Sequence, residues 1–269
     1  MRSLLIRIVA ALAGGALLAL LVLPLAAVVL RVPPAALVER LGEREILEAL
    51  RLSLIASLAA AAVVVAGGLP IAWLLASRSF RGKRALEVLI DLPMVLPPTV
   101  AGFALLMAFG RTGIVGAALA RLGISIPFTT VAVVIAQAFM SAPFFVNAAR
   151  AGFAAVDPRY VETAATLRAS ELERFVRVVL PLSAPALLAG IAMTWARALG
   201  EFGATITFAG NLPGVTETLP LAVYVAMQSD LQAALVLSTL LLAASCTLLF
   251  AVRLRPGLWL SRDARSRAA

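Results

Sequence analysis

Long apolar stretches alternate with short charged stretches along the whole chain. An α-helix needs about 20 apolar residues to cross the hydrocarbon core of a bilayer, and six stretches reach that length. The pattern therefore predicts an all-α integral membrane protein with six transmembrane helices in one domain, residues 1–269. The predicted spans are 8–30, 52–76, 88–109, 129–149, 182–209 and 233–252.

The first apolar stretch follows two arginines, Arg2 and Arg7, as the apolar region of a signal peptide does. It is too long for such a region, however, and no small-residue cleavage site separates it from Arg-Val-Pro-Pro at 31–34. We therefore expect a retained helix. The acidic segment 34–50, with leucines at helical spacing, is predicted to lie on the external membrane interface or against the helix ends.

Basic residues are distributed unevenly between the two sets of connections. The connections 1–7, 77–87, 150–180 and 253–269 hold 16 of the 23 lysines and arginines. The connections 31–51, 110–128 and 210–232 hold six, and the remaining one, Arg197, lies within the fifth predicted span. By the positive-inside rule, both termini are predicted to be cytoplasmic.

Composition excludes several classes of function. Hydrophobic residues make up 62% of the chain and charged residues 14%, against about 25% in soluble domains. The net charge of +9 is typical of nucleic-acid binding, but the arginines cluster between apolar runs, so we expect no nucleic-acid partner. The chain has no histidine, which excludes histidine-dependent catalysis. The single cysteine, Cys246, lies in an apolar run and is predicted to be a buried thiol.

No nucleotide-binding loop is present, because Gly82-Lys83 is followed by Arg84 rather than by serine or threonine. No cluster of acidic residues indicates a metal site either. We therefore expect neither a cofactor nor a metal in this chain, and no enzymatic activity. If ATP drives its function, a separate subunit must bind and hydrolyse the nucleotide.

The largest predicted cytoplasmic connection, residues 156–181, contains an amphipathic helix. Asp157 is a capping residue, Pro158 suits the first helical position, and apolar residues recur at three- and four-residue steps as far as Leu172. Two interpretations are open. The helix packs on the ends of its own bundle, or it docks into a groove on a separate cytoplasmic protein.

The order of residues in this connection resembles the EAA loop of ABC importer permeases. That loop has a Glu-x-Ala-Ala run and a later Val-x-Leu-Pro, as at 162–165 and 178–181, with Ala169 where the family has glycine. The resemblance implies a type I importer core whose coupling helix binds a cleft of a dimeric ATPase subunit. The residues carried over to this role are Glu162, Ala164, Ala165, Ala169, Leu180 and Pro181.

Two further stretches resemble the molybdate/tungstate branch of these permeases. They are Asp-Leu-Pro-Met-Val-Leu-Pro-Pro from Asp91 and Gly-Glu-Phe-Gly-Ala-Thr from Gly200, followed by Asn-Leu-Pro-Gly at 211–214. The resemblance covers about residues 50–253. It implies a homodimer in the lipid of a prokaryotic cytoplasmic membrane, with an extracytoplasmic oxyanion-binding protein as a further partner.

Polar residues inside the predicted spans are candidates for a translocation path or gate. Arg197 and Glu201 are four residues apart, so they can pair on one helix face, and that face either packs internally or lines the path. The prolines near residue 97 are predicted to kink or break the third span. The external loop 211–218 is either a connector or a contact for the binding protein. The path or gate candidates are Arg197, Glu201, Thr205, Thr207, Pro97 and Pro98.

The sequence thus predicts a molybdate or tungstate ABC importer permease. A sulfate or thiosulfate permease is the alternative within the same class, because sulfate permeases share the Gly-Glu-Phe-Gly segment. A membrane enzyme or an ATP-independent channel is the alternative from another class. The absence of histidine disfavours the enzyme, and the coupling loop disfavours the channel.

Overall fold

The computed structural model describes residues 2–253, and every regular element in that range is helical. In chain order the elements are α1 (Arg2–Leu30), α2 (Pro34–Arg40), α3 (Arg44–Ser77), α4 (Lys83–Val95), α5 (Pro98–Phe109), α6 (Gly116–Arg121), α7 (Thr130–Ala154), α8 (Pro158–Thr166), α9 (Glu171–Arg174), the π-helix η1 (Phe175–Val179), α10 (Leu180–Leu199), α11 (Gly203–Phe208), α12 (Leu219–Ser229) and α13 (Leu231–Arg253).

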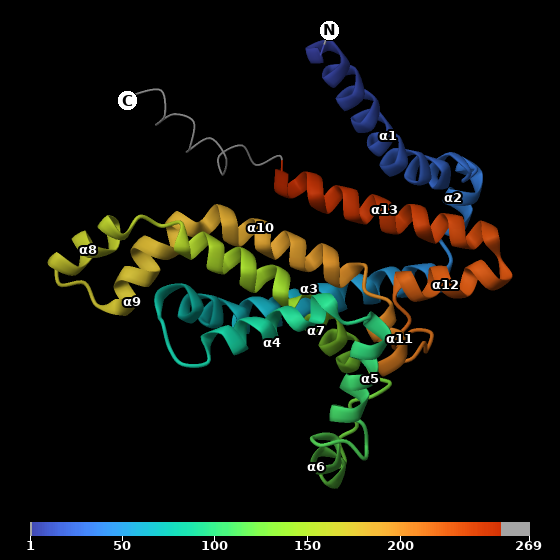
Figure 1. Ribbon diagram of the computed structural model, residues 1–269. Helices are drawn as coiled ribbons and strands as arrows, with labels where there is room; N and C mark the ends of the chain where they lie inside the picture. The colour runs from blue at the N-terminus through green and yellow to red at the C-terminus, as the bar shows by residue number, and fades with distance from the viewer. Residues whose placement is uncertain (1, 254–269) are drawn as a thin grey trace.

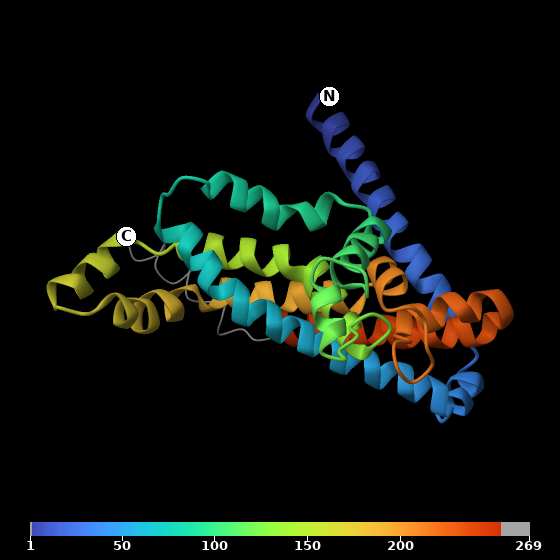
Figure 2. The same cartoon turned by 90° about the horizontal axis from the view of Figure 1, so that it is seen from below.

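The centre of the molecule is a bundle of α3, α7 and α10, which pack closely against one another. Phe145, Val146 and Leu75 are buried in its core, and a second core joins α5 and α11 to α7. Figures 1 and 2 show α8 and α9 protruding from one end of this bundle, while α5 and α6 project to its side.

In the part of the chain that the structure describes, four helical stretches are long and apolar enough to cross a membrane. They lie within α1, α3, α7 and the continuous helical stretch Glu171–Leu199, and the α4–α5 pair makes a fifth if it is counted as one bent span. The last predicted span, 233–252, falls within α13, of which Leu231–Thr247 forms a shorter apolar helix.

The third predicted span, 88–109, is broken as its prolines predict. The helix direction bends by 118° from α4 to α5, with the break at Leu96 and Pro97. Proline lacks the N–H that continues a helix, and Pro98 occupies the first position of α5, where that N–H is not needed. The break therefore redirects the chain from α4, beside α7, to α5, beside α11.

The prediction of one continuous fifth span over 182–209 is wrong. Helix α10 ends at Leu199, and the separate helix α11 begins at Gly203. Glycine has a low helix propensity, and two glycines flank the break. The Glu201 carboxylate also accepts a hydrogen bond from the Ala204 N–H at 2.8 Å, which satisfies an N–H at the start of α11.

Two other predictions are compared with the structure here. The segment 34–50, predicted to lie on the external interface or against the helix ends, is divided between two helices, because α2 ends at Arg40 and α3 begins at Arg44 and runs through the predicted second span. The buried Ile46 and Ala49 pack against α12 and α13, which explains why α3 starts early. Cys246 is exposed on α13 rather than buried.

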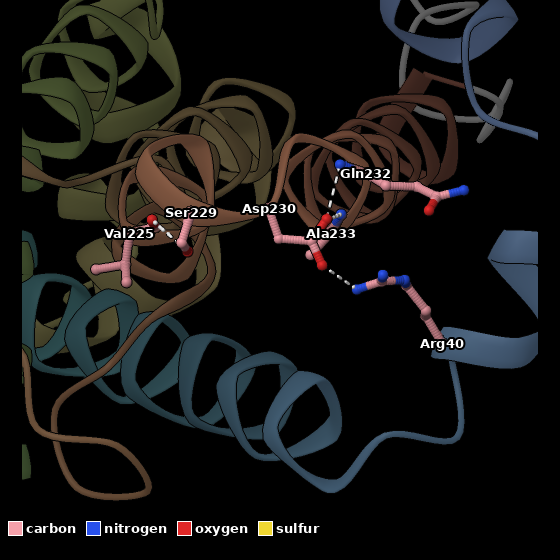
Figure 3. A network of polar contacts seen from close by, with 6 residues as sticks. All are labelled: Arg40, Val225, Ser229, Asp230, Gln232 and Ala233. Atoms are coloured by element: carbon pink, nitrogen blue, oxygen red, sulfur yellow. Dashed lines mark hydrogen bonds and ion pairs between the residues drawn. The ribbon is translucent and has the colours of Figure 1, made fainter.

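An ordered polar corner joins α2 to the start of α13 (Figure 3). Asp230 accepts hydrogen bonds from the N–H groups of Gln232 and Ala233, each at 3.0 Å, and its second oxygen lies 2.7 Å from Arg40 Nη1. The Ala233 N–H, with Arg40, lowers the pKa of Asp230. Because the folded pKa is lowered, this stabilisation is present above the ordinary pKa of aspartate and is lost as pH falls through the folded value.

Helices α5 and α11 approach each other through glycines. A Cβ atom on Gly102 would lie 2.6 Å from the carbonyl oxygen of Ala204, and one on Gly203 would lie 2.7 Å from the Cβ atom of Pro98. Real Cβ atoms essentially never come that close to another heavy atom. At these two glycines α5 and α11 therefore approach too closely for any residue with a Cβ atom.

We expect Gly102→Ala to destabilise the chain by about 1–3 kcal/mol, because the added methyl group meets backbone that cannot move aside. Gly67→Ala in α3 is the matched control, since nothing lies within 4 Å of its added Cβ atom. In the control, alanine's higher helix propensity favours the variant. Thermal unfolding of the detergent-solubilised proteins measures both effects, and equal midpoints would contradict the close packing.

Candidate coupling surface and translocation path

Helix α8 begins as the sequence predicts. The Asp157 side chain accepts a hydrogen bond from the Arg159 N–H at 2.9 Å, and Pro158 occupies the first helical position. The helix ends at Thr166, and Arg168 follows in the left-handed region with φ of 61°. Leu172 therefore lies on α9 rather than on the same helix, which corrects the predicted continuous periodicity.

The start of α9 is fixed by a reciprocal capping box. The Ser170 hydroxyl accepts a hydrogen bond from the Glu173 N–H, and the Glu173 carboxylate accepts one from the Ser170 N–H at 2.9 Å. Helices α8 and α9 thus form a hairpin, here called the α8–α9 hairpin and comprising residues 158–174. Ala169, at the position where related loops have glycine, lies in its turn.

The outer surface of the α8–α9 hairpin carries apolar side chains. Leu167 is 78% exposed and Leu172 is 71% exposed, and Glu162 and Ala165 of the same hairpin are exposed as well. Two further predicted coupling residues of the hairpin, at 164 and 169, are half-buried. Leu180 and Pro181 lie apart from this surface, at the start of α10. Four of the six predicted coupling residues therefore belong to the hairpin, and the other two belong to α10.

The hairpin is tied to the bundle by polar and aromatic contacts. Arg78, which follows α3, holds both carboxylate oxygens of Glu171 at 2.9 and 3.1 Å. Phe175 of η1 contacts Trp73 and Phe153, with ring centroids 4.9 and 5.7 Å away. The hairpin and η1 are therefore in contact with α3 and α7.

Arg197 and Glu201 form the ion pair that their spacing predicts. Arg197 Nη2 lies 2.6 Å from Glu201 Oε2. The two side chains differ in exposure, since that of Glu201 is 1% exposed and that of Arg197 is 27% exposed. The carboxylate is therefore enclosed by the chain, whereas part of the Arg197 side chain reaches the surface.

The other path or gate candidates are not on one surface. Thr205 is fully buried and its hydroxyl has no hydrogen-bond partner within residues 2–253, whereas the half-buried Thr207 donates to the Gly203 carbonyl at 2.9 Å. Pro97 and Pro98 are exposed at the bend between α4 and α5. The structure brings Pro98 beside Gly203, and so brings the two helix breaks together.

Polar groups in α4 and α7 were not anticipated from the sequence. Arg150 Nη1 lies 2.7 Å from Glu87, and Asn147 donates to Asp91 at 2.7 Å, so both contacts tie α4 to α7. Gln137 is fully buried in α7, and neither of its amide atoms has a partner in the described chain. An amide inside an apolar run is the signal that marks Gln137 in the sequence.

The loop after α11 is an ordered turn. Gly210 and Gly214 both have φ of 72°, and the Thr216 hydroxyl accepts a hydrogen bond from the Leu212 N–H at 2.9 Å. Thr130 at the start of α7 donates to the carbonyl of residue 215 at 2.9 Å. The loop is therefore fastened to the adjoining helix.

Comparison of folds relates this chain to known importers. A chain of a bacterial ABC transporter that imports the acidic polysaccharide alginate superposes with a TM-score of 0.71. The match covers 91% of this chain and 92% of the other, at 13% identity. An inward-facing methionine ABC transporter, MetNI, gives a TM-score of 0.60 over 80% of this chain and 94% of the other, at 16% identity. At such low identity these matches establish the fold alone.

Comparison of sequences gives closer relatives. The chain is 44% identical over 207 residues to the molybdenum transport system permease protein ModB of Mycobacterium tuberculosis, covering 77% of this chain and 78% of that protein. It is 37% identical over 237 residues to the sulfate transport system permease protein CysT of Escherichia coli, covering 87% and 86%. The family model for the binding-protein-dependent transport system inner membrane component matches residues 68–255. The chain therefore belongs to this family of ABC importer permeases.

Proposed function

We propose that this permease carries molybdate or tungstate across the cytoplasmic membrane, driven by a separate ATPase. The observation that supports this cargo is the 44% identity to molybdenum permeases from two mycobacteria over about three quarters of each chain. As an ABC importer permease the chain is a transport protein and not an enzyme. ATP is bound and hydrolysed by a different subunit.

The exposed α8–α9 hairpin supports coupling to that ATPase. Several exposed apolar side chains on one projecting element indicate an interaction surface, and the hairpin exposes Leu167, Leu172 and the small Ala165. A helix with such a surface fits a groove on a second protein. The ion pair between Arg78 and Glu171 then passes motion of the hairpin to α3.

A second copy of the chain completes the path in this proposal. Helices α5, α6 and α1 project from the bundle (Figure 1), and apolar side chains are exposed along α1 and α5. In such a dimer the path lies between the two chains, and both termini face the ATPase side. An extracytoplasmic binding protein delivers the anion to the opposite side.

The test is uptake by proteoliposomes that contain the permease with its ATPase and binding protein. We expect ATP-dependent accumulation of molybdate, which tungstate inhibits and sulfate in large excess does not. Calorimetry on the binding protein alone then shows tight binding of molybdate and tungstate. Uptake and binding of sulfate alone would reject the proposed cargo, and uptake without ATP would reject coupled transport.

Sulfate is the second candidate cargo because the sulfate permease of Escherichia coli matches a larger share of this chain, 87%, although at the lower identity of 37%. The same experiment separates the two cargoes. The tetrahedral divalent anions share their charge and shape, so the permease requires the same chemistry in either case.

A further inference from the structure

Arg197 lies level with the interior of the bundle. The neighbouring Trp195 donates a hydrogen bond to the Ser57 hydroxyl at 2.9 Å. Ser57 is within α3, about 20 Å from the Arg44 end of that helix at the α-helical rise per residue. Ser57 also falls within the predicted span 52–76, so Arg197, in the last turn of α10, lies within the apolar depth of the membrane rather than in bulk water.

A charged group at this depth is costly unless it is paired or faces water. Glu201 pairs with one edge of the guanidinium, and the Arg197 side chain is still 27% exposed at the surface of the chain. Lipid is a poor environment for a partly exposed side chain that ends in a charge. We infer that it faces the water-filled path, on a surface that it shares with the exposed Met193 and Gly200.

The Glu201 carboxylate determines how strongly the surface around Arg197 attracts an anion. Glu201 Oε2 lies 2.6 Å from Arg197, and Oε1 is held by the Ala204 N–H, so the carboxylate cannot turn toward the path. The pair has no net charge. An oxyanion therefore meets a planar fork of N–H donors without a strong long-range attraction, and can bind briefly and leave.

We propose that Arg197 is the oxyanion contact of the path and that Glu201 is its positioning residue. The proposal rests on the proposed function, because it assumes that a tetrahedral oxyanion passes this surface. The proposal gives the two residues of the pair different roles. Arg197 recognises the anion, while Glu201 orients the guanidinium, anchors the start of α11 and prevents tight binding.

The test uses proteoliposomes with the permease, its ATPase and the binding protein loaded with molybdate. The Arg197→Gln/Glu201→Gln double variant removes both charges together, and the amide oxygen introduced at position 201 still accepts from the Ala204 N–H. We expect anion transported per ATP hydrolysed to fall about tenfold, because a charge-assisted hydrogen bond to the anion is lost.

Arg197→Lys is the second variant, because it keeps the ion pair with Glu201 and therefore the local fold. It loses the planar fork, so transport per ATP should fall severalfold while the unfolding midpoint stays near that of the parent. Transport at the parent ratio by either folded variant would overturn the proposal. If the parent protein itself moves no molybdate, the proposed cargo fails instead, and the variants are then measured with sulfate.

Discussion

Replacing Glu201 by alanine is expected to destabilise the folded chain by about 3 kcal/mol. Removing one partner of a buried ion pair typically costs about 3–5 kcal/mol, because the other charge is left without compensation. The lower end applies here, since the Arg197 side chain is 27% exposed and keeps some contact with water. The substitution also removes the acceptor of the Ala204 N–H at the start of α11. Thermal unfolding in detergent measures the loss.

A second arginine–glutamate pair provides the control for this prediction. Arg44 Nε lies 2.7 Å from Glu48 Oε1, also at a spacing of four residues, but the two side chains are 90% and 39% exposed. Glu48→Ala should leave the unfolding midpoint almost unchanged, since exposed pairs contribute little. The neutral double variant at 197 and 201 should recover most of the stability lost in Glu201→Ala. Equal effects at Glu48 and Glu201 would show that burial does not govern this pair.

Local signals explain what the sequence could predict about this region. The Asp157-Pro158 start of α8 depends on one side chain and the next two residues, and the break at Pro97 depends on a missing N–H. The Arg197–Glu201 contact needs only four residues of spacing. Each feature is encoded within one or two helical turns, and each is present in the structure.

The division of the fifth predicted span depends on residues far apart in the chain. Hydropathy is continuous from 182 to 209, and the separation of α10 from α11 is accompanied by the approach of Gly203 to Pro98, about a hundred residues earlier. The exposure difference within the Arg197–Glu201 pair has the same origin, because it depends on which neighbours cover each side chain. Spacing predicts that the two residues meet, but only the packed structure shows which of them reaches the surface.

Substituting Ala165 by arginine is expected to abolish ATPase binding and to reduce ATP-dependent uptake to background. Ala165 is exposed on α8, and its small side chain permits close approach of a partner surface. An arginine there adds a long charged side chain to the proposed interface, which must then desolvate that charge and move apart. The stability of the permease itself should not change, because no buried contact of the chain is altered.

Ala120→Arg is the matched control, since it makes the same substitution at an exposed position of α6. The distribution of basic residues predicts that α6 lies on the opposite side of the membrane, so this variant should still co-purify with the ATPase. Co-purification and thermal unfolding are measured for both proteins in detergent. If Ala165→Arg retains the ATPase as well as the control does, the α8–α9 hairpin is not the coupling surface.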